Sequence, residues 1–132
     1  MGHFNFDESH PYLAGNFKPM RFEGTAPFLE VEGDIPDDFT GVFYLNSACP
    51  QFPPNAKNYH WFAGDGKVHA YYFRGQGIVD YATRWVRTQS FDLERQAKRA
   101  LFGNKKYGAQ TDIDPSVRHI APQTANTNIF YQ

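Results

Sequence analysis

Five histidines and one cysteine are the side chains here that could hold a metal or attack a substrate. Imidazole and thiolate groups bind zinc or iron when several of them converge, and short spacings such as H-E-x-x-H place them on one element. The chain has no such motif and no His/Cys cluster. The sequence therefore predicts no independent metal site from its histidines, which are His3, His10, His60, His69 and His119.

Cys49 and Asp65 are the next candidates for chemistry. A cysteine acts as a nucleophile when a base activates it and a third group orients that base. Cys49 and His60 have no evident third group, so we interpret Cys49 as a small apolar core residue. The turn that contains Asp65 lacks a G-x-G-x-x-G or G-K-[ST] pattern and does not predict a phosphate cradle. Asp65 is expected to accept hydrogen bonds within its own turn.

Composition limits the classes of function. The 132 residues allow one domain, and 13 basic against 14 acidic residues favour neither nucleic acid nor a strongly anionic membrane as a partner. Aromatic residues reach 17%, which fits a β-rich core or an apolar ligand pocket. The lone cysteine excludes an internal disulfide and fits a reducing compartment. We find no secretory signal and no apolar run of the ~18 residues that span a bilayer, so we expect a cytoplasmic chain without a transmembrane segment.

A predicted β-hairpin positions the candidate residues. Lys67–Phe73 and Ile78–Val86 are rich in β-branched and aromatic residues, and the glycine-containing turn at residues 75–77 joins them. Side-chain alternation puts Val79, Tyr81, Thr83 and Trp85 on one face of the return strand. We expect positive φ angles, which suit glycine, at the four glycines of the reversals, Gly64, Gly66, Gly75 and Gly77.

Other segments flank the hairpin. Prolines and glycines interrupt residues 1–28 too often for a long helix or an inner strand, so this segment is predicted to be an ordered arm. Two strands, Phe28–Glu32 and Gly41–Asn46, are predicted to follow it, and Ser47–Asn58 is predicted to be an extended loop.

The C-terminal third contains the one predicted helix, Ser90–Phe102. Ser90 is its expected N-cap, Glu94 and Lys98 are spaced to pair across one turn, and Gly103 suits the position after its end. A polar loop follows, and a new strand is predicted from Thr124 to Tyr131. The predicted fold is all-β with one short helix at about residues 90–102.

Residues 61–88, WFAGDGKVHAYYFRGQGIVDYATRWVRT, resemble the N-terminal signature of the carotenoid cleavage oxygenase family, which includes lignostilbene dioxygenases. That family shows a W/F-F-x-G-D-G-x-V-H run and then a hairpin that ends in R-W/Y-V-R-T. Residues 33–44, 50–52 (PQF) and 124–128 (TANTN) match further segments in the family's order. The resemblance covers most of the chain from about Leu29, and it divides the chain into an N-terminal arm, 1–28, and the first strands and hairpin of an incomplete propeller domain, 29–132.

The resemblance implies a truncated N-terminal part of a seven-bladed β-propeller whose central Fe(II) is held by four histidines. In the family all four follow the point where this chain ends. His60 and His69 are therefore not their counterparts, and no iron is expected in this chain alone. His69 falls in the G-D-G-x-V-H run, and we interpret it as a packed, hydrogen-bonded imidazole.

Trp85 and Arg118 are the candidate substrate-pocket residues that the resemblance implies. In lignostilbene-type members, the tyrosine of R-Y-V-R-T and the lysine of D-P-S-V-K contact the phenol of the substrate. This sequence has Trp85 and Arg118 at those positions. An arginine stays protonated and tryptophan has no hydroxyl, so neither suits deprotonation of a 4-hydroxystilbene. Core packing for Trp85 and a surface ion pair for Arg118 are the alternatives.

The resemblance implies the N-terminal portion of a non-haem Fe(II) dioxygenase. Such an enzyme uses O2 to cleave a C=C bond of a carotenoid, apocarotenoid or stilbene-type substrate. The alternative is an inactive truncated product, or a small β module that binds an apolar ligand or a partner. The fragment alone is expected to lack activity, and it is expected to need the remainder of its own chain to fold.

Overall fold

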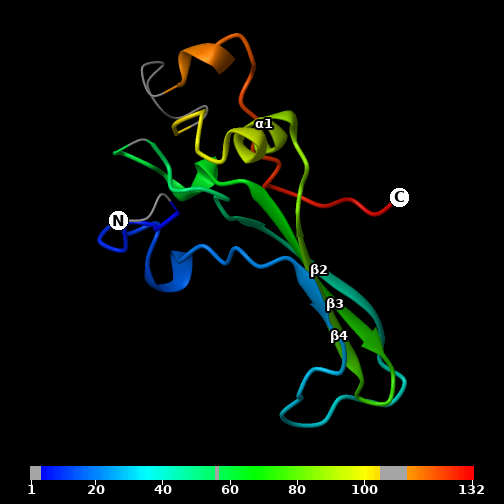
Figure 1. The fold of residues 1–132 in the computed structure, drawn as a ribbon. Coiled ribbons are helices and arrows are strands. Elements are labelled where there is room, and N and C mark those ends of the chain that lie inside the picture. The colour runs from blue at the N-terminus through cyan, green and yellow to red at the C-terminus, as the bar shows by residue number, and fades with distance from the viewer. Residues whose placement is uncertain (1–3, 56, 105–112) are drawn as a thin grey trace.

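The computed structural model describes residues 4–55, 57–104 and 113–132. Its centre is one antiparallel four-stranded sheet with the strand order β1-β4-β3-β2. Figure 1 shows this sheet as a long twisted ribbon with helix α1 and most of the loops at one end. The elements are η1 (Gly15–Phe17), β1 (Gly24–Ala26), β2 (Thr40–Ala48), η2 (Trp61–Ala63), β3 (Gly66–Arg74), β4 (Val79–Trp85), α1 (Gln89–Ala97) and η5 (Pro115–Val117), where η denotes a 3-10 helix.

The predicted hairpin is confirmed as β3 and β4, which pair from Lys67↔Trp85 to Phe73↔Val79. Its turn needs left-handed backbone, with φ angles of 83° at Gly75, 52° at Gln76 and 72° at Gly77. Two glycines are suited to such a turn because they lack a Cβ that would clash. The predicted strand at 41–46 is also confirmed, within the longer β2.

Gly64 and Gly66 have a different role from the one predicted. Gly64 has a φ of −64°, and Gly66 is not among the residues with positive φ. What both positions require is the absence of a side chain. A Cβ on Gly66 would overlap the Ala125 carbonyl oxygen, and one on Gly64 would stand 3.0 Å from the Tyr59 hydroxyl. The turn is therefore a place where three segments of backbone come close together.

Two predicted strands are wrong. Residues 28–32 form no strand, since Phe28 has a φ of 56° and an exposed side chain. Its N–H donates to the Asp80 side chain, and the Leu29 N–H donates to Val79 O. The prediction of this strand rested only on the alternation of apolar and charged residues. The strand that pairs with β4 on the side away from β3 is β1, which lies within the predicted arm. Residues 124–131 also form no strand; instead they cross the sheet and accept single hydrogen bonds, such as Gly66 N–H to Thr124 O at 2.6 Å.

The predicted helix exists but is shorter and capped differently. Thr88, and not Ser90, is the N-cap, because its hydroxyl accepts from the Phe91 N–H. The helix ends at Ala97, where Lys98 takes the left-handed conformation predicted for Gly103. The carboxylate of Glu94 accepts from the N–H groups of Leu101 and Phe102 at 2.8 and 3.1 Å. These two hydrogen bonds to the buried Glu94 carboxylate turn the chain after α1 back onto the helix. The last turn of the predicted helix, up to Phe102, therefore does not form.

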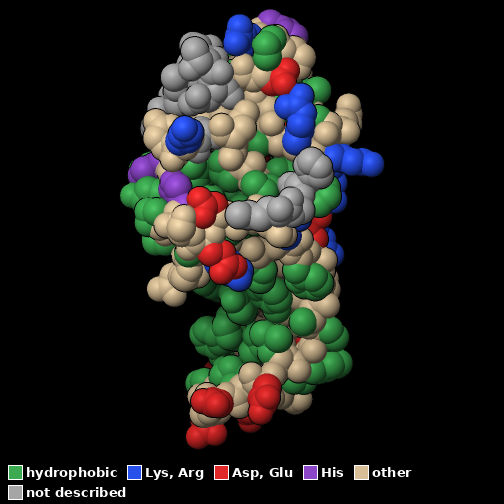
Figure 2. Space-filling view, turned by 60° about the vertical axis from the view of Figure 1, so that its left-hand side comes forward, with side chains coloured by type: hydrophobic (Ala, Val, Ile, Leu, Met, Phe, Trp, Pro, Cys, Tyr) green, Lys and Arg blue, Asp and Glu red, His purple; other side chains and the backbone are tan. Residues whose placement is uncertain are grey.

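Three small clusters of buried residues lie at the end of the sheet near α1. One joins Leu101, Phe102, Ile113 and Val117; a second joins Leu13, Tyr59 and Ala63; a third joins Cys49, Trp85 and Phe91. The other end is thinly covered, and every side chain of β2 from Thr40 to Leu45 is exposed. In Figure 2 hydrophobic side chains gather along this narrow part, with acidic side chains at its tip.

Candidate functional site

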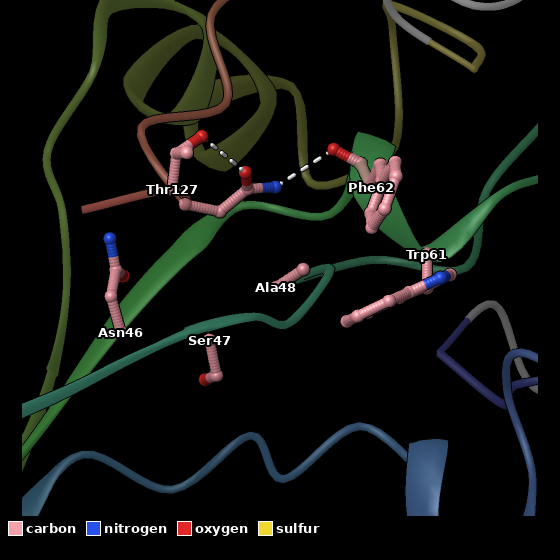
Figure 3. A pocket seen from close by; sticks show the side chains of 7 residues that line it. Asn46, Ser47, Ala48, Trp61, Phe62 and Thr127 are labelled. Carbon is pink, nitrogen blue, oxygen red and sulfur yellow. Dashed lines mark hydrogen bonds between the residues drawn. The ribbon is translucent and has the colours of Figure 1, made fainter.

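A hollow of about 350 Å³ lies where β2, η2 and the C-terminal segment meet. Aromatic Trp61 and Phe62 form one side of it, while amide and hydroxyl groups of the crossing C-terminal segment form the other (Figure 3). It combines an apolar wall with a polar rim, the usual make-up of a small-molecule site. Its lining residues are Asn46, Ser47, Ala48, Trp61, Phe62, Asn126 and Thr127. We call this the first hollow.

Local hydrogen bonds fix the aromatic wall. The His60 Nδ1 accepts from the Phe62 N–H at 3.2 Å and caps η2, which carries both Trp61 and Phe62. The Asn126 side-chain amide donates to the carbonyl oxygens of Phe62 and Gly64, both at 2.8 Å. One asparagine therefore ties the C-terminal segment to both ends of the turn that presents the wall, and Figure 3 shows its bond to Phe62 O.

Asn46 fixes the other side of the first hollow. Its Nδ2 donates to the carbonyl oxygens of Ala125 and Asn128 at 3.2 and 3.3 Å. Its Oδ1 is buried and has no hydrogen-bond partner within the described part of the chain. A buried acceptor left without a donor costs about 1–3 kcal/mol, so this side of the hollow favours a bound water or hydroxyl group.

His69 lies beside the hollow in a closed hydrogen-bond chain. The Ser47 hydroxyl donates to Lys67 O, so the His69 Nε2–H donates to Ser47 Oγ at 3.0 Å, and its Nδ1 accepts from the Tyr81 hydroxyl at 2.6 Å. Burial, and then the Lys67 ammonium, lower the pKa of His69 below its ordinary 6.5. The imidazole is neutral with both nitrogens engaged, which confirms the packed interpretation.

Lys67 is a buried cation that the sequence did not single out. It is 0% exposed, its Nζ donates to the carbonyl oxygens of Met20 and Phe22, and it lies 4.3 Å from the centre of the Trp85 ring. Burial lowers the pKa of this ammonium. The contacts hold the N-terminal arm against the sheet, so Lys67 acts as a clasp for the arm.

Cys49 and Asp65 are structural. Cys49 is buried against Trp85 and Phe91, and burial raises the pKa of its thiol, so the apolar interpretation is supported. Asp65 is buried as well, and its Oδ2 accepts from the Gln51 N–H at 3.0 Å. This bond joins residues 14 positions apart, so Asp65 also accepts from outside the turn in which its hydrogen bonds were predicted.

The described residues offer no metal site. Across residues 4–55, 57–104 and 113–132, no group of three or more His, Cys, Asp or Glu side chains is placed to hold an ion. His60 caps η2, and His69 is bonded through both nitrogens, so neither ring is turned toward a shared centre. His3 lies outside the described residues. Nor does any helix in this described part have the length and apolar character to cross a membrane.

Trp85 and Arg118 lie in different surroundings. Trp85 is 7% exposed, and its Nε1–H donates to Cys49 O at 2.8 Å inside the third cluster. Arg118 is exposed just after η5, and its Nε donates to Ile113 O at 3.4 Å. Neither side chain lines the first hollow. Their assignment to a substrate pocket stays a prediction.

Comparison with known proteins decides the family. The family described as RPE65, retinal pigment epithelial membrane protein, matches residues 17–132. The chain belongs to this RPE65/carotenoid oxygenase family. The match starts 12 residues earlier than the motif resemblance at about Leu29, and it includes β1. The resemblance in the hairpin signature is thereby confirmed.

Individual relatives agree with this. The chain is 40% identical over 121 residues to resveratrol cleavage oxygenase 1 of Aspergillus fumigatus, covering 92% of this chain and 23% of the relative. It is 41% identical over 126 residues to isoeugenol monooxygenase of Pseudomonas putida, covering 95% and 25%. The crystal structure of Pseudomonas brassicacearum lignostilbene dioxygenase superposes with a TM-score of 0.76 at 31% identity, over 94% of this chain and 24% of that one. The chain thus spans about a quarter of the length of these relatives.

The residues of the first hollow were not predicted as a site. Trp61, Phe62 and Asn126 all stand in segments that carry the family resemblance, 61–88 and 124–128. Their meeting depends on a contact between segments more than 60 residues apart, from Asn126 to Phe62 and Gly64. Sequence spacing held no sign of that contact.

Proposed function

We propose that this chain is the N-terminal portion of an oxygenase that uses O2 to cleave a C=C bond in an apolar substrate. The observation that carries the proposal is the first hollow, whose aromatic wall and polar rim are built from the segments that mark the family. Family membership supports the reaction class. The protein in which this chain continues to the length of its relatives is called the extended protein below.

The chemistry of the hollow favours an aromatic alkene. Trp61 and Phe62 offer ring faces and edges, and aromatic pairs contribute about 0.5–1.5 kcal/mol beyond the area that they bury. The unpaired Asn46 Oδ1 would accept from a hydroxyl group directly or through water. Relatives are named for resveratrol, isoeugenol and lignostilbene, all of which combine an aromatic ring with an alkene. Carotenoid-derived polyenes remain the other substrate class of the proposal.

Fe(II), which the family resemblance implies, does not fit the residues described. No convergent set of ligands is present within them, and both candidate imidazoles are otherwise engaged. The proposal therefore assigns iron to the extended protein, with ligands from outside this chain, and assigns to this chain the walls that hold the substrate. Metal analysis of the 132-residue chain purified with Fe(II) is expected to find no stoichiometric iron; one tightly bound iron per chain would overturn this division of roles.

The substrate-pocket roles of Trp85 and Arg118 form a separate part of the proposal. Because neither side chain accepts a proton from a phenol at neutral pH, we expect these two positions to tilt the extended protein away from phenol-activated cleavage of a 4-hydroxystilbene. Replacing Trp85→Tyr and Arg118→Lys together is expected to raise relative cleavage of the hydroxystilbene, and a general base contributes ~10²–10⁴-fold where it acts. If the parent already prefers the hydroxystilbene and the double variant matches it, these two roles are wrong.

The reaction is tested by supplying the extended protein with ¹⁸O2 and either isoeugenol, a hydroxystilbene or an apocarotenoid. We expect carbonyl products from scission at the alkene, with label from O2 in at least one of them. A folded, iron-loaded protein that consumes O2 with none of these substrates, and leaves every C=C bond intact, would reject the proposed reaction.

A second candidate function follows from β2. Its side chains from Thr40 to Leu45 are exposed, as expected of a β module that presents an apolar strand to a ligand or partner. An inactive truncated product would have the same surface. Sequencing the downstream DNA distinguishes the enzyme from the module. An in-frame continuation rich in spaced histidines supports the enzyme, whereas a stop codon together with a monomeric, stable chain supports the module.

A further inference from the structure

Trp61 stands between two hollows. The second hollow, of about 360 Å³, lies between the N-terminal arm and the sheet. It shares Trp61 and the end of β2 with the first hollow. In Figure 3 the Trp61 ring extends beneath Ala48, with Phe62 above it and the arm running below. The residues that line only the second hollow are Asn16, Phe17, Lys18, Pro19, Met20, Cys49, Lys67 and His69.

The arm holds the Trp61 ring in place. The Phe17 ring lies 5.4 Å from it at an interplanar angle of 58°. Tyr12 packs edge-on against Phe17 at 5.6 Å and lies 4.8 Å from His60, the residue that caps η2. Phe62 contacts Trp61 from the other side at 4.6 Å. Trp61 is nevertheless 36% exposed, so its position depends on these ring contacts and not on burial.

Two polar side chains that line only the second hollow, Lys67 and His69, are already bonded. The Lys67 Nζ donates to two arm carbonyls, and both His69 ring nitrogens are engaged. What this hollow offers a ligand is apolar surface from Phe17, Pro19 and Met20. It therefore suits the continuation of a hydrocarbon.

We propose that Trp61 is the residue that sets how long a substrate the site accepts, and that Phe17 is the positioning residue that keeps it there. With the indole in place, the first hollow alone is at the lower limit of ligand-site volumes, about 300–1,000 Å³, and suits an alkene bearing a single ring. Without the indole, the two hollows join into a space of roughly twice that volume, which admits a polyene. The inference rests on the proposed alkene cleavage and deepens it by naming the length of the substrate.

The test is a competition in the extended protein between isoeugenol and a long apocarotenoid. Removing a group that excludes a substrate from a pocket changes discrimination by about 10–200-fold per methylene-sized contact. Trp61→Ala is therefore expected to shift the kcat/KM ratio toward the apocarotenoid by about tenfold or more, through a lower KM for the apocarotenoid. Phe17→Leu is expected to shift the ratio in the same direction by a smaller factor, and Trp61→Phe to restore most of the parent ratio.

Phe4→Leu is the matched control. Phe4 is also an exposed aromatic residue of the arm, but it packs on Phe52 at 6.0 Å and lines neither hollow, so the ratio should stay at the parent value. If the parent cleaves neither substrate, the proposed function fails. If the parent is active and the kcat/KM ratio is unchanged in Trp61→Ala, the proposal that Trp61 limits the length of the substrate is rejected. Should Trp61→Ala fail to fold, Phe17→Leu decides: a ratio equal to that of Phe4→Leu rejects the inference, and a shift toward the apocarotenoid supports it.

Discussion

The two ends of the sheet differ in what covers them. The head, residues 49–55, 57–66 and 85–104, contains buried polar groups and aromatic rings that are bonded across segments far apart in sequence. The far end, residues 28–45 and 71–80, has one buried hydrophobic side chain, Val79, while Phe28, Phe39 and Phe43 are at least half exposed. Other segments of the chain therefore cover the sheet at one end and leave it bare at the other (Figure 1).

This difference shows what the family signature does. The G-D-G turn and the strand ends next to it bring together the arm, the loop before η2, α1 and the C-terminal segment. Three of its residues make these contacts possible. Gly66 has no side chain and lets the C-terminal segment come close, Asp65 accepts a hydrogen bond from Gln51, and Lys67 donates to the arm. The far end carries equally apolar residues that the described part of the chain leaves exposed, so it is the region where we expect other parts of the extended protein to pack.

The largest effect is expected in the head, at Gly66. In Gly66→Ala the new Cβ would overlap Ala125 O and lie 2.6 Å from Ala125 C, both backbone atoms. We expect a loss of about 3 kcal/mol or more, the upper range for overpacking. The control is Gly77→Ala at the far turn, where φ is +72° but no atom lies within 4 Å, and a left-handed residue costs about 1 kcal/mol. Denaturant melts of the extended protein measure both, and equal losses would contradict the close-approach role.

Lys67→Met tests whether Lys67 holds the N-terminal arm against the sheet. It removes the cation from Trp85 and from the carbonyls of Met20 and Phe22, and a hydrogen bond to a charged group contributes about 1.5–3 kcal/mol. We expect a destabilisation of about 2 kcal/mol and faster hydrogen exchange in the arm. Lys18→Met is the control, because Lys18 pairs with Glu8 on the exposed surface and should change stability by less than about 0.5 kcal/mol. Arm exchange that is no faster than in the control would show that the arm is held by other contacts.

Phe43→Lys tests the open surface. Phe43 is 55% exposed on β2, the edge strand with no partner on its outer side among the described residues. The isolated chain is expected to self-associate through this edge, and a charged residue there opposes edge pairing. Sedimentation should show fewer oligomers for Phe43→Lys than for the parent or for the control Ile78→Lys, with stability changed by less than about 0.5 kcal/mol. A parent chain that is monomeric and melts cooperatively would contradict the open-surface account.

The smallest effect is expected from the pH dependence of His69. Its folded-state pKa is lowered below the ordinary 6.5, so the unfolded chain binds the proton more readily. The stabilising contribution of the neutral ring is complete above about pH 6.5 and is lost as the pH falls below that value toward the folded-state pKa. His69→Gln should flatten this part of the stability curve. Curves of equal slope for parent and His69→Gln would reject the assignment.

Local pattern was sufficient to predict part of this fold. The hairpin and β2 followed from β-branched and aromatic runs bounded by glycine, and α1 from spacing. The pattern failed where a tertiary contact decides. The Glu94 carboxylate ends the helix early by binding two later N–H groups, and β1 pairs with β4 from within a segment broken by prolines.

The candidate site was less predictable than the fold. The family resemblance drew attention to Trp85 and Arg118, neither of which lines the first hollow. The hollow itself is made by Asn126 and Asn46 binding backbone carbonyls of distant segments. Amide side chains that bind backbone have no characteristic spacing in sequence, so only the folded chain reveals them.

The most direct test of the account is a crystal structure of the extended protein with a bound, uncleaved aromatic alkene. The account predicts ligand atoms within about 4.5 Å of Trp61, Phe62 and Thr127, in the first hollow, with the far end of the sheet covered by later residues of the chain. A first hollow filled by protein side chains, with the ligand bound elsewhere, would contradict it.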